Sequence, residues 1–353
     1  MPEETAKERN FWKPIKVTAL IAISLTVLYL VKPVAHVLIL FFASILFAVF
    51  LCAVADFFQK KIKVPRIISI LVSIIVIFSI PTLIVWLYGP SVAEQALKLG
   101  DFAEKAFNNY KDWLSQYEWG RLLLSEVSHP QKIIPIGSDV VLRITDAFSQ
   151  FLGAMTNFLI IFLLGVYLSH SPDVYINNLI KLFPRERRSR MHEVVAEIGG
   201  ALRKWLIGRF ASMLIIGVMV AVAYWIIDLP LAGILGIIAA IVSFIPYVGP
   251  IIAAFPAMLV AVSEDPATVL YVVLVYTFVQ ILESYLITPM IQMKAVHLPP
   301  AMLIGMQILM GVLMGAWGVL LATPFVVCVI VIIQMLYVHD VLGDKIRILG
   351  KRI

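Results

Sequence analysis

Charged residues are scarce in this sequence. Only 14% of its 353 residues are Asp, Glu, Lys or Arg, whereas 61% are hydrophobic and the mean hydropathy is +0.97. Soluble domains average about 25% charged and about 45–50% apolar residues. A soluble fold of this length could not bury so much apolar surface, so lipid must solvate part of it. The composition therefore predicts an all-α integral membrane protein that crosses the bilayer several times.

Cysteine and catalytic motifs are also nearly absent. Cys52 and Cys328 are the only cysteines, and each lies inside an apolar run, so we expect two small hydrophobic side chains and no disulfide or metal framework. No Walker loop and no Gly-x-Ser-x-Gly elbow occurs, and His192-Glu193 lacks the second histidine of a zinc-protease helix. We therefore expect no enzyme, no ATP-driven pump and no cofactor. Any transport must use an ion gradient, such as H⁺ or Na⁺, or the gradient of the solute itself.

Basic residues gather in short clusters between the apolar runs, and they give a net charge of +6. The strongest clusters span residues 60–66 and 181–209, both termini are basic, and acidic residues outnumber basic ones in residues 89–150. This distribution is typical of cytoplasmic loops and not of a nucleic-acid footprint. It predicts an inner-membrane protein with both termini in the cytoplasm and residues 89–150 outside.

The apolar runs predict six full spans, since a membrane helix needs about 20 apolar residues. They are residues 17–31, 34–55, 67–88, 151–168, 210–227 and 267–288. Residues 89–150 carry a helical apolar stripe and predict an external cap, with a ligand-binding domain as the alternative. The expected organisation is a three-span region (1–88), this external loop, a fourth span with a basic cytoplasmic helix (151–208), a transport core (209–338) and a basic tail (339–353).

Two further apolar runs, residues 231–262 and 301–338, are too long for one span each. The first is broken at residues 246–250, where two prolines flank a glycine, and the second by Gly311, residues 315–318 and Pro324. We expect two helical hairpins that enter from opposite sides, the first with its tip at residues 244–250. Inverted repeats of broken helices surround substrate sites in transporters. Ordinary kinked spans are the alternative, because glycine and proline are common in membrane helices.

Glu283 is the one acidic residue well inside an apolar run, where a charge costs at least about 2.5–3.5 kcal/mol. Gln280 and Tyr276 share its helix face, and Ser284 follows it. This cluster is either an ion or substrate site or a structural hydrogen-bond network. The full set of candidate pathway residues adds those at the two hairpins. These are Pro246, Tyr247, Gly249, Pro250, Gln307, Gly315, Gly318 and Thr323.

Several motifs together resemble the autoinducer-2 exporter family of bacterial permeases over almost the whole chain. They are Phe244-Ile245-Pro246-Tyr247-Val248-Gly249-Pro250, the Gln280-x-x-Glu283 pair followed by Pro289, Leu298-Pro299, Gly311-x-x-x-Gly315-x-x-Gly318 with Ala322-Thr323-Pro324, and the stretch from Leu182-Phe183-Pro184-Arg185 to Gly208. The resemblance implies secondary transport in a bacterial inner membrane. Members of the family are linked to export of the autoinducer-2 signal, and others to sodium–proton antiport.

We therefore predict a permease that exports a small polar molecule such as autoinducer-2. The alternatives are a Na⁺ or Li⁺–proton antiporter with Glu283 as its proton-exchanging carboxylate, and a membrane scaffold or pore that does not transport actively. The expected partners are a small molecule or ion, the lipid bilayer and further copies of the chain, without nucleic acid. The hairpin tips would flank the substrate, with Gln280 and Glu283 beside it.

Overall fold

The computed structural model describes residues 33–61, 63–79, 140–287, 299–345, 347–348 and 351–352, with scattered positions between 82 and 116. The expected first span, most of the external loop and the 289–298 loop lie outside the described residues. Within them, five helices are long and apolar enough to cross a membrane, which confirms an all-α polytopic membrane protein. These five are Pro33–Lys61, Gly153–His170, Arg185–Ile226, Ala267–Ile287 and Pro300–His339.

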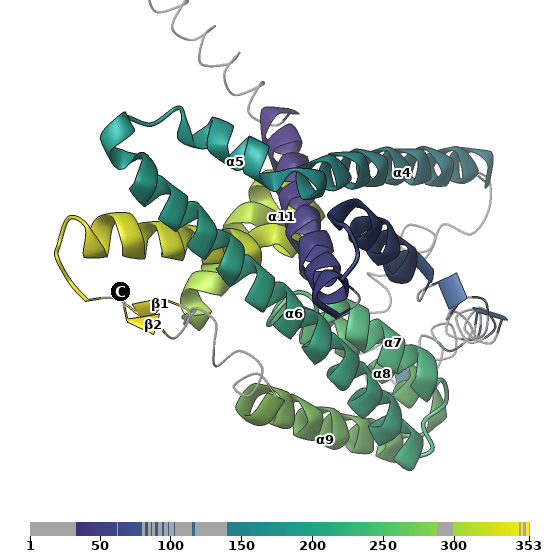
Figure 1. The fold of residues 1–353 in the computed structure, drawn as a ribbon. Coiled ribbons are helices and arrows are strands. Elements are labelled where there is room, and N and C mark those ends of the chain that lie inside the picture. The colour runs from purple at the N-terminus through teal and green to yellow at the C-terminus, as the bar shows by residue number, and fades with distance from the viewer. Residues whose placement is uncertain are drawn as a thin grey trace, which may run out of the picture.

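Helices account for nearly all the described secondary structure (Figure 1). After Pro33–Lys61 and Arg66–Ser79 come α4 (Val140–His170), α5 (Pro172–Ile180), the 3₁₀ turn η2 (Arg185–Arg187), α6 (Arg188–Ile226), α7 (Ala232–Val242), α8 (Val248–Glu264), α9 (Pro266–Leu282), the π turn η3 (Glu283–Ile287), α11 (Pro300–Ile332) and the π turn η4 (Ile333–His339). Two-residue strands, β1 (Arg347–Ile348) and β2 (Lys351–Arg352), pair antiparallel near the C-terminus.

Helix α6 is the longest element and runs diagonally through the molecule (Figure 1). Its 39 residues join the basic segment, which we expect in the cytoplasm, to the expected span 210–227 without a break. At 1.5 Å per residue the helix is about 58 Å long, roughly twice the hydrocarbon thickness of a bilayer. The N-terminal half of α6, which carries the basic residues, must therefore extend beyond the bilayer as a direct continuation of the membrane span. No helix break occurs near residue 209, where we expected one region of the chain to end and the next to begin.

Small residues bring α6 and α7 close together. A Cβ added at Gly217 would lie 2.6 Å from the Cβ of Ala240, and one at Gly236 would lie 2.6 Å from the Cβ of Ala221. Membrane helices associate largely through such close backbone packing, because lipid offers no hydrophobic driving force between them. The α6–α7 contact belongs to a buried cluster that continues through α8 and α9. A second cluster packs helix Pro33–Lys61 and the first half of α6 against α11.

The first expected hairpin is present as two helices joined by a tight turn. Helix α7 ends at Val242 and α8 begins at Val248, so the tip spans residues 243–247, and Tyr247 adopts a left-handed φ of 64°. The tip is shorter than expected, because Gly249 and Pro250 already belong to the first turn of α8, where proline costs no hydrogen bond. A Cβ at Gly249 would collide with the carbonyl of Val242, so glycine permits the two helices to meet.

The second expected hairpin folds back at a single residue. Gly315 interrupts α11 with φ 64° and ψ −146°, a conformation that essentially only glycine adopts. A Cβ at Gly318 would collide with the carbonyl of Met310, whereas an uninterrupted helix would hold residues eight apart at a distance of about 12 Å. Gly311 and Pro324, which were also expected to interrupt the run, lie within helical segments.

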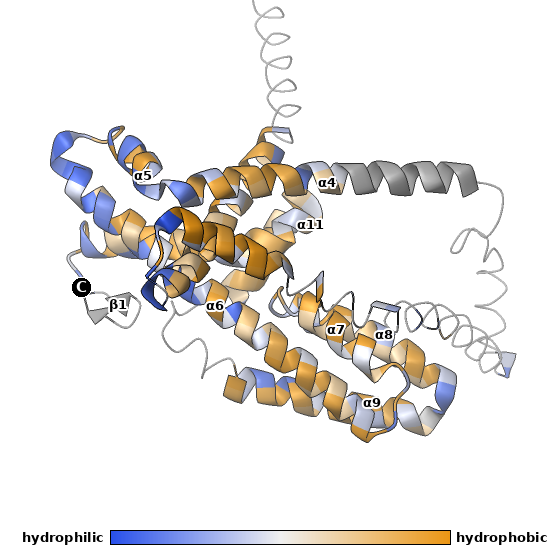
Figure 2. Cartoon of the chain, turned by 45° about the vertical axis from the view of Figure 1, so that its right-hand side comes forward, coloured by the Kyte–Doolittle hydropathy of each residue, from blue (hydrophilic) through white to orange (hydrophobic). Residues whose placement is uncertain are grey.

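Two ion pairs show which segments share one end of the molecule. Arg203 of α6 pairs with Asp56 near the end of helix Pro33–Lys61, and Arg190 pairs with Asp340 at 2.8 Å. The two basic clusters and the C-terminal end of the second hairpin therefore lie together. Figure 2 shows hydrophilic residues concentrated at α5 and the start of α6, whereas α7 and α8 are mainly hydrophobic.

Candidate functional site

Three side chains from three different helices bond to the first hairpin, two of them at its tip and one in the first turn of α8. The turn between α7 and α8 interrupts the regular backbone bonding of the two helices, although the carbonyl of Pro246 accepts a bond from the N–H of Val248 (2.7 Å). The bonds run from Arg209 Nε to the oxygen of Phe244 (3.1 Å), from Gln307 Nε2 to the oxygen of Pro246 (3.0 Å), and from Tyr276 Oη to the oxygen of Pro250 (2.7 Å). Helices α6, α9 and α11 thus converge on this turn.

The hairpins reach this junction from opposite ends of α6. Arg209 lies near the middle of α6 and contacts the tip of the first hairpin. Arg190, at the start of α6, donates to Asp340 and to the carbonyl of Met335, beyond the last helical arm of the second hairpin. Gln307, eight residues before the turn at Gly315, then connects the second hairpin to the first tip. The two hairpins therefore approach the junction from different ends of α6, and their entry from opposite sides of the membrane stays a prediction.

Side chains of α6, α11 and the π turn after α9 carry buried polar atoms without a protein partner. An unpaired buried polar group costs about 1–3 kcal/mol, so such groups usually indicate water, an ion or a ligand. In the described part of the chain, two such atoms, Arg66 Nε and Gln334 Oε1, belong to partly exposed side chains, and the other six belong to side chains that are at most 7% exposed. These six atoms are Arg209 Nη2, Ser212 Oγ, Tyr224 Oη, Glu283 Oε2, Gln307 Oε1 and Thr323 Oγ1.

Glu283 and Arg209 are the two buried charges of this region. Glu283 is 7% exposed and opens the π turn η3 after α9, and Arg209 is 3% exposed on α6. Their charges interact electrostatically, yet the ion pairs between described residues do not include a direct one between them. Each charge offsets part of the cost of burying the other, while both keep polar atoms free for a further partner.

Tyr276 links this junction to a second group of buried aromatic residues. Its ring stacks on Tyr224 with the centroids 6.4 Å apart and the planes 23° from parallel. A small cavity of about 170 Å³ between α6, α8 and α9 is lined by both tyrosines and by Met258. The buried hydroxyl of Tyr224 therefore adds a polar group beside an otherwise apolar space.

The structure brings most of the predicted pathway residues to the junction, although not all of them. Pro246, Pro250, Tyr276 and Gln307 are bonded there, and Glu283 and Thr323 are buried with free polar atoms. Gly249 and Gly318 enable the close backbone contacts described above. The remaining predicted residues show other environments: Gln280 is half-buried, while Tyr247, Ser284 and Gly315 are exposed.

Arg209 is the main residue that the sequence analysis missed as part of the site. It was counted with the basic cluster 181–209, because it immediately precedes an uncharged apolar run and therefore resembled the last charge of a loop. The continuous helix α6 places it on the buried side instead, next to the first hairpin. Ser212, one turn later and fully buried, was also missed, since a lone serine in an apolar span carries little signal.

Comparison with known proteins gives consistent results. The family model described as AI-2E family transporter matches residues 18–337. "Putative transport protein YueF" of Bacillus subtilis is 25% identical over 346 residues, which cover 89% of this chain and 90% of the relative. YrrI of the same organism, which bears the same description, is 31% identical over 143 residues, about 40% of each chain. This chain therefore belongs to the AI-2E family of membrane transporters, as its motifs predicted.

Proposed function

We propose that the protein is a secondary transporter that exports a small polar solute such as autoinducer-2 through the junction of the two hairpins. The observation that carries the proposal is that side chains from three helices bond to the first hairpin, and that the same region of the sequence carries buried polar atoms that lack protein partners, including Arg209 Nη2 and Gln307 Oε1. Non-helical backbone at membrane depth is tolerated where it is buried in protein or lines a watery cavity. The two breaks at residues 243–247 and at Gly315 fit such a pathway.

The opposed hairpins suggest how access alternates. Each hairpin would enter the membrane from one side and close the solute site toward that side. A rocking movement of one hairpin against the other would then open the site to one side at a time. The bond from Gln307 to Pro246 joins the two units, so it must break when the tips separate. The bond from Arg209 ties the first tip to α6, which then forms the frame for this movement.

The free polar atoms indicate the chemistry of the solute. The guanidinium of Arg209 donates, the amide oxygen of Gln307 accepts, and the hydroxyls of Ser212 and Thr323 do both. A compact solute with several hydroxyl or carbonyl groups would satisfy them. The positive charge of Arg209 opposes a bare alkali cation at the same place, which favours the exporter over the antiporter.

The antiporter remains the second candidate because of one observation at Glu283. Its Oε2 is buried and has no partner among the described residues, as expected of a carboxylate that binds and releases a proton or a cation. For either function we propose an inner-membrane location with both termini in the cytoplasm, because the two basic clusters and the C-terminal segment share one end of the molecule. We also propose a homo-oligomer, as predicted from the sequence.

Proteoliposomes that contain the full chain distinguish these functions. Flux of labelled autoinducer-2 and proton movement driven by Na⁺ or Li⁺ are measured across pH for the wild type, Arg209→Gln and Glu283→Gln, with Ser284→Ala as the exposed neighbouring control. Saturable signal flux that both buried variants abolish and Ser284→Ala retains supports export. Cation-driven proton movement that only Glu283→Gln abolishes supports the antiporter instead. Absence of both fluxes in the wild type contradicts the transporter and leaves the scaffold.

A further inference from the structure

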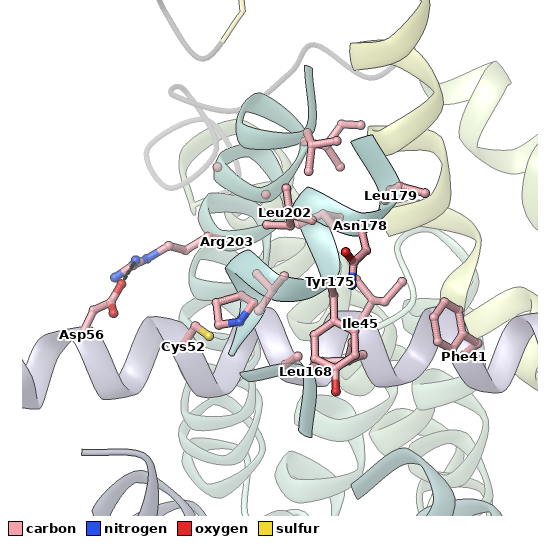
Figure 3. A pocket seen from close by; sticks show the side chains of 18 of the residues that line it. Phe41, Ile45, Cys52, Asp56, Leu168, Tyr175, Asn178, Leu179, Leu202 and Arg203 are labelled. Atoms are coloured by element: carbon pink, nitrogen blue, oxygen red, sulfur yellow. Dashed lines mark hydrogen bonds and ion pairs between the residues drawn. The ribbon is translucent and has the colours of Figure 1, made fainter. Parts of the chain in front are cut away.

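A cavity of about 800 Å³ lies apart from the hairpin junction, between helix Pro33–Lys61, α5 and the first half of α6. Figure 3 shows Phe41, Ile45, Cys52 and Asp56 along one helix, with Tyr175, Leu179, Leu202 and Arg203 opposite. None of the described residues that line it belongs to the two hairpins. Its volume is that of a site for a sizeable organic ligand, about 300–1,000 Å³ in general.

One end of this cavity is polar and carries an excess of positive charge. Arg203 pairs with Asp56, and Arg66 donates through Nη2 to the carbonyl of Ser169 (3.2 Å). The Nε of Arg66 is buried and has no partner among the described atoms. Lys60 lies one helical turn beyond Asp56 on the same face and is exposed. Two guanidinium groups, those of Arg66 and Arg203, thus line this end of the cavity beside a single carboxylate, and Lys60 lies outside the lining.

The rest of the cavity is apolar and opens at the protein surface. Ile45, Val49 and Leu202 form its walls. Of its lining residues, Phe41 is 47% exposed, Leu179 is 50% exposed and Leu182 is 81% exposed. An opening bordered by exposed apolar side chains on a short helix next to a basic segment is typical of the membrane interface. The cavity therefore leads from the hydrocarbon region to a cationic end.

We propose that this cavity binds an anionic phospholipid, with an acyl chain between Ile45 and Leu202 and the phosphate beside Arg66 and Arg203. An amphiphile matches both ends, since guanidinium groups bind phosphate well and apolar walls accept a hydrocarbon chain. Basic pockets between membrane helices on the cytoplasmic side bind anionic headgroups. A small polar solute would find few partners along these walls. The orientation proposed above would place this lipid in the cytoplasmic leaflet. The binding of the lipid itself does not depend on that orientation.

The test is native mass spectrometry of the purified full-length protein, titrated in detergent with dioleoylphosphatidylglycerol and separately with dioleoylphosphatidylcholine. Half-saturation of the wild type should require a roughly tenfold lower concentration of the phosphatidylglycerol than of the phosphatidylcholine. This is the effect expected when one or two basic groups contact a headgroup of net negative charge. Gly199→Leu should lower this binding about tenfold. Gly199 lines the cavity and a Cβ there meets nothing within 4 Å, so the added side chain fills the cavity without disturbing the backbone.

Gly153→Leu is the matched control, because Gly153 is also helical and equally open but does not line the cavity. Asn178→Glu is a second variant, at an exposed position of the lining, and its added charge should weaken binding of the anionic lipid only. It also decides the outcome if Gly199→Leu fails to fold. Equal binding of the two lipids, or unchanged binding by both variants, would overturn the proposal. The readout is lipid binding, so it is independent of the transport assay.

Discussion

The side-chain amide of Gln307 donates a hydrogen bond of 3.0 Å to the carbonyl of Pro246, and this bond joins the second hairpin to the tip of the first. The two residues are 61 positions apart, and Gln307 is only 2% exposed. A buried amide in such a place fixes the relative position of two broken helices more sharply than apolar contacts would, because the bond is directional. The contact makes the two hairpins one coupled unit.

The first prediction concerns this bond. Gln307→Met keeps the shape of the side chain and removes the donor that joins the two hairpins, at a cost of about 0.5–1.5 kcal/mol, because the carbonyl of Pro246 keeps its bond from the backbone N–H of Val248 (2.7 Å). We expect a lower unfolding temperature and a severalfold loss of transport in proteoliposomes. Gln334→Met is the control, since Gln334 lies in η4, far along the chain from the hairpin tips. Equal losses in the two variants would contradict a special role of the bond.

The second prediction concerns the two buried charges. Arg209→Gln or Glu283→Gln alone leaves one buried charge without its counter-charge, which destabilises by up to about 3–5 kcal/mol. The double variant should lose less than the sum of the singles, with a coupling of at least about 1 kcal/mol in chemical unfolding followed by circular dichroism. The control cycle uses Arg203→Gln and Asp56→Asn, whose side chains are 39% and 30% exposed. That pair should couple by about 0–1 kcal/mol. Additive effects at positions 209 and 283 would contradict the prediction.

The third prediction concerns the second hairpin turn. Gly315→Ala places a side chain at φ 64° and ψ −146°, which costs about 1–3 kcal/mol in backbone strain although the space around it is open. Gly305→Ala is the control, because Gly305 is helical and equally open and should gain up to about 1 kcal/mol. Thermal unfolding of the purified variants should move in opposite directions. A stabilised Gly315→Ala would show that the turn is not required.

The fourth prediction concerns orientation in the membrane. In a background with Cys52→Ala and Cys328→Ala, single cysteines at Lys61, Lys181 and Val341 should react with an impermeant maleimide only after the cells are opened. A cysteine at Asp265 should react in intact cells, because the turn between α8 and α9 lies beyond the far end of α6. All four positions are exposed. Labelling of position 341 in intact cells would contradict the proposed topology.

Hydropathy and helix-breaking residues alone predicted much of this architecture. The excess of apolar residues required a membrane protein, and the two over-long runs with their prolines and glycines predicted helix breaks at residues 244–250 and 315–318. These predictions succeeded because a span length and a missing backbone donor are local properties of the chain. The breaks themselves proved narrower, at residues 243–247 and at Gly315, whereas Gly311 and Pro324 keep helical conformation.

The functional junction, in contrast, depends on tertiary contacts. Arg209 looked like a loop charge in the sequence, and only the packing of α6 against the first hairpin buries it and directs it to Phe244. Glu283 was identifiable because an isolated carboxylate in an apolar run is conspicuous, whereas its relation to Arg209 was not. The burial of a side chain and its hydrogen-bond partners depend on residues dozens of positions away in the sequence. The spacing of residues along the chain does not show which of these distant residues lie close together in space. Hydropathy therefore determines that this chain spans a membrane with broken helices, and the packing of those helices decides which polar groups meet.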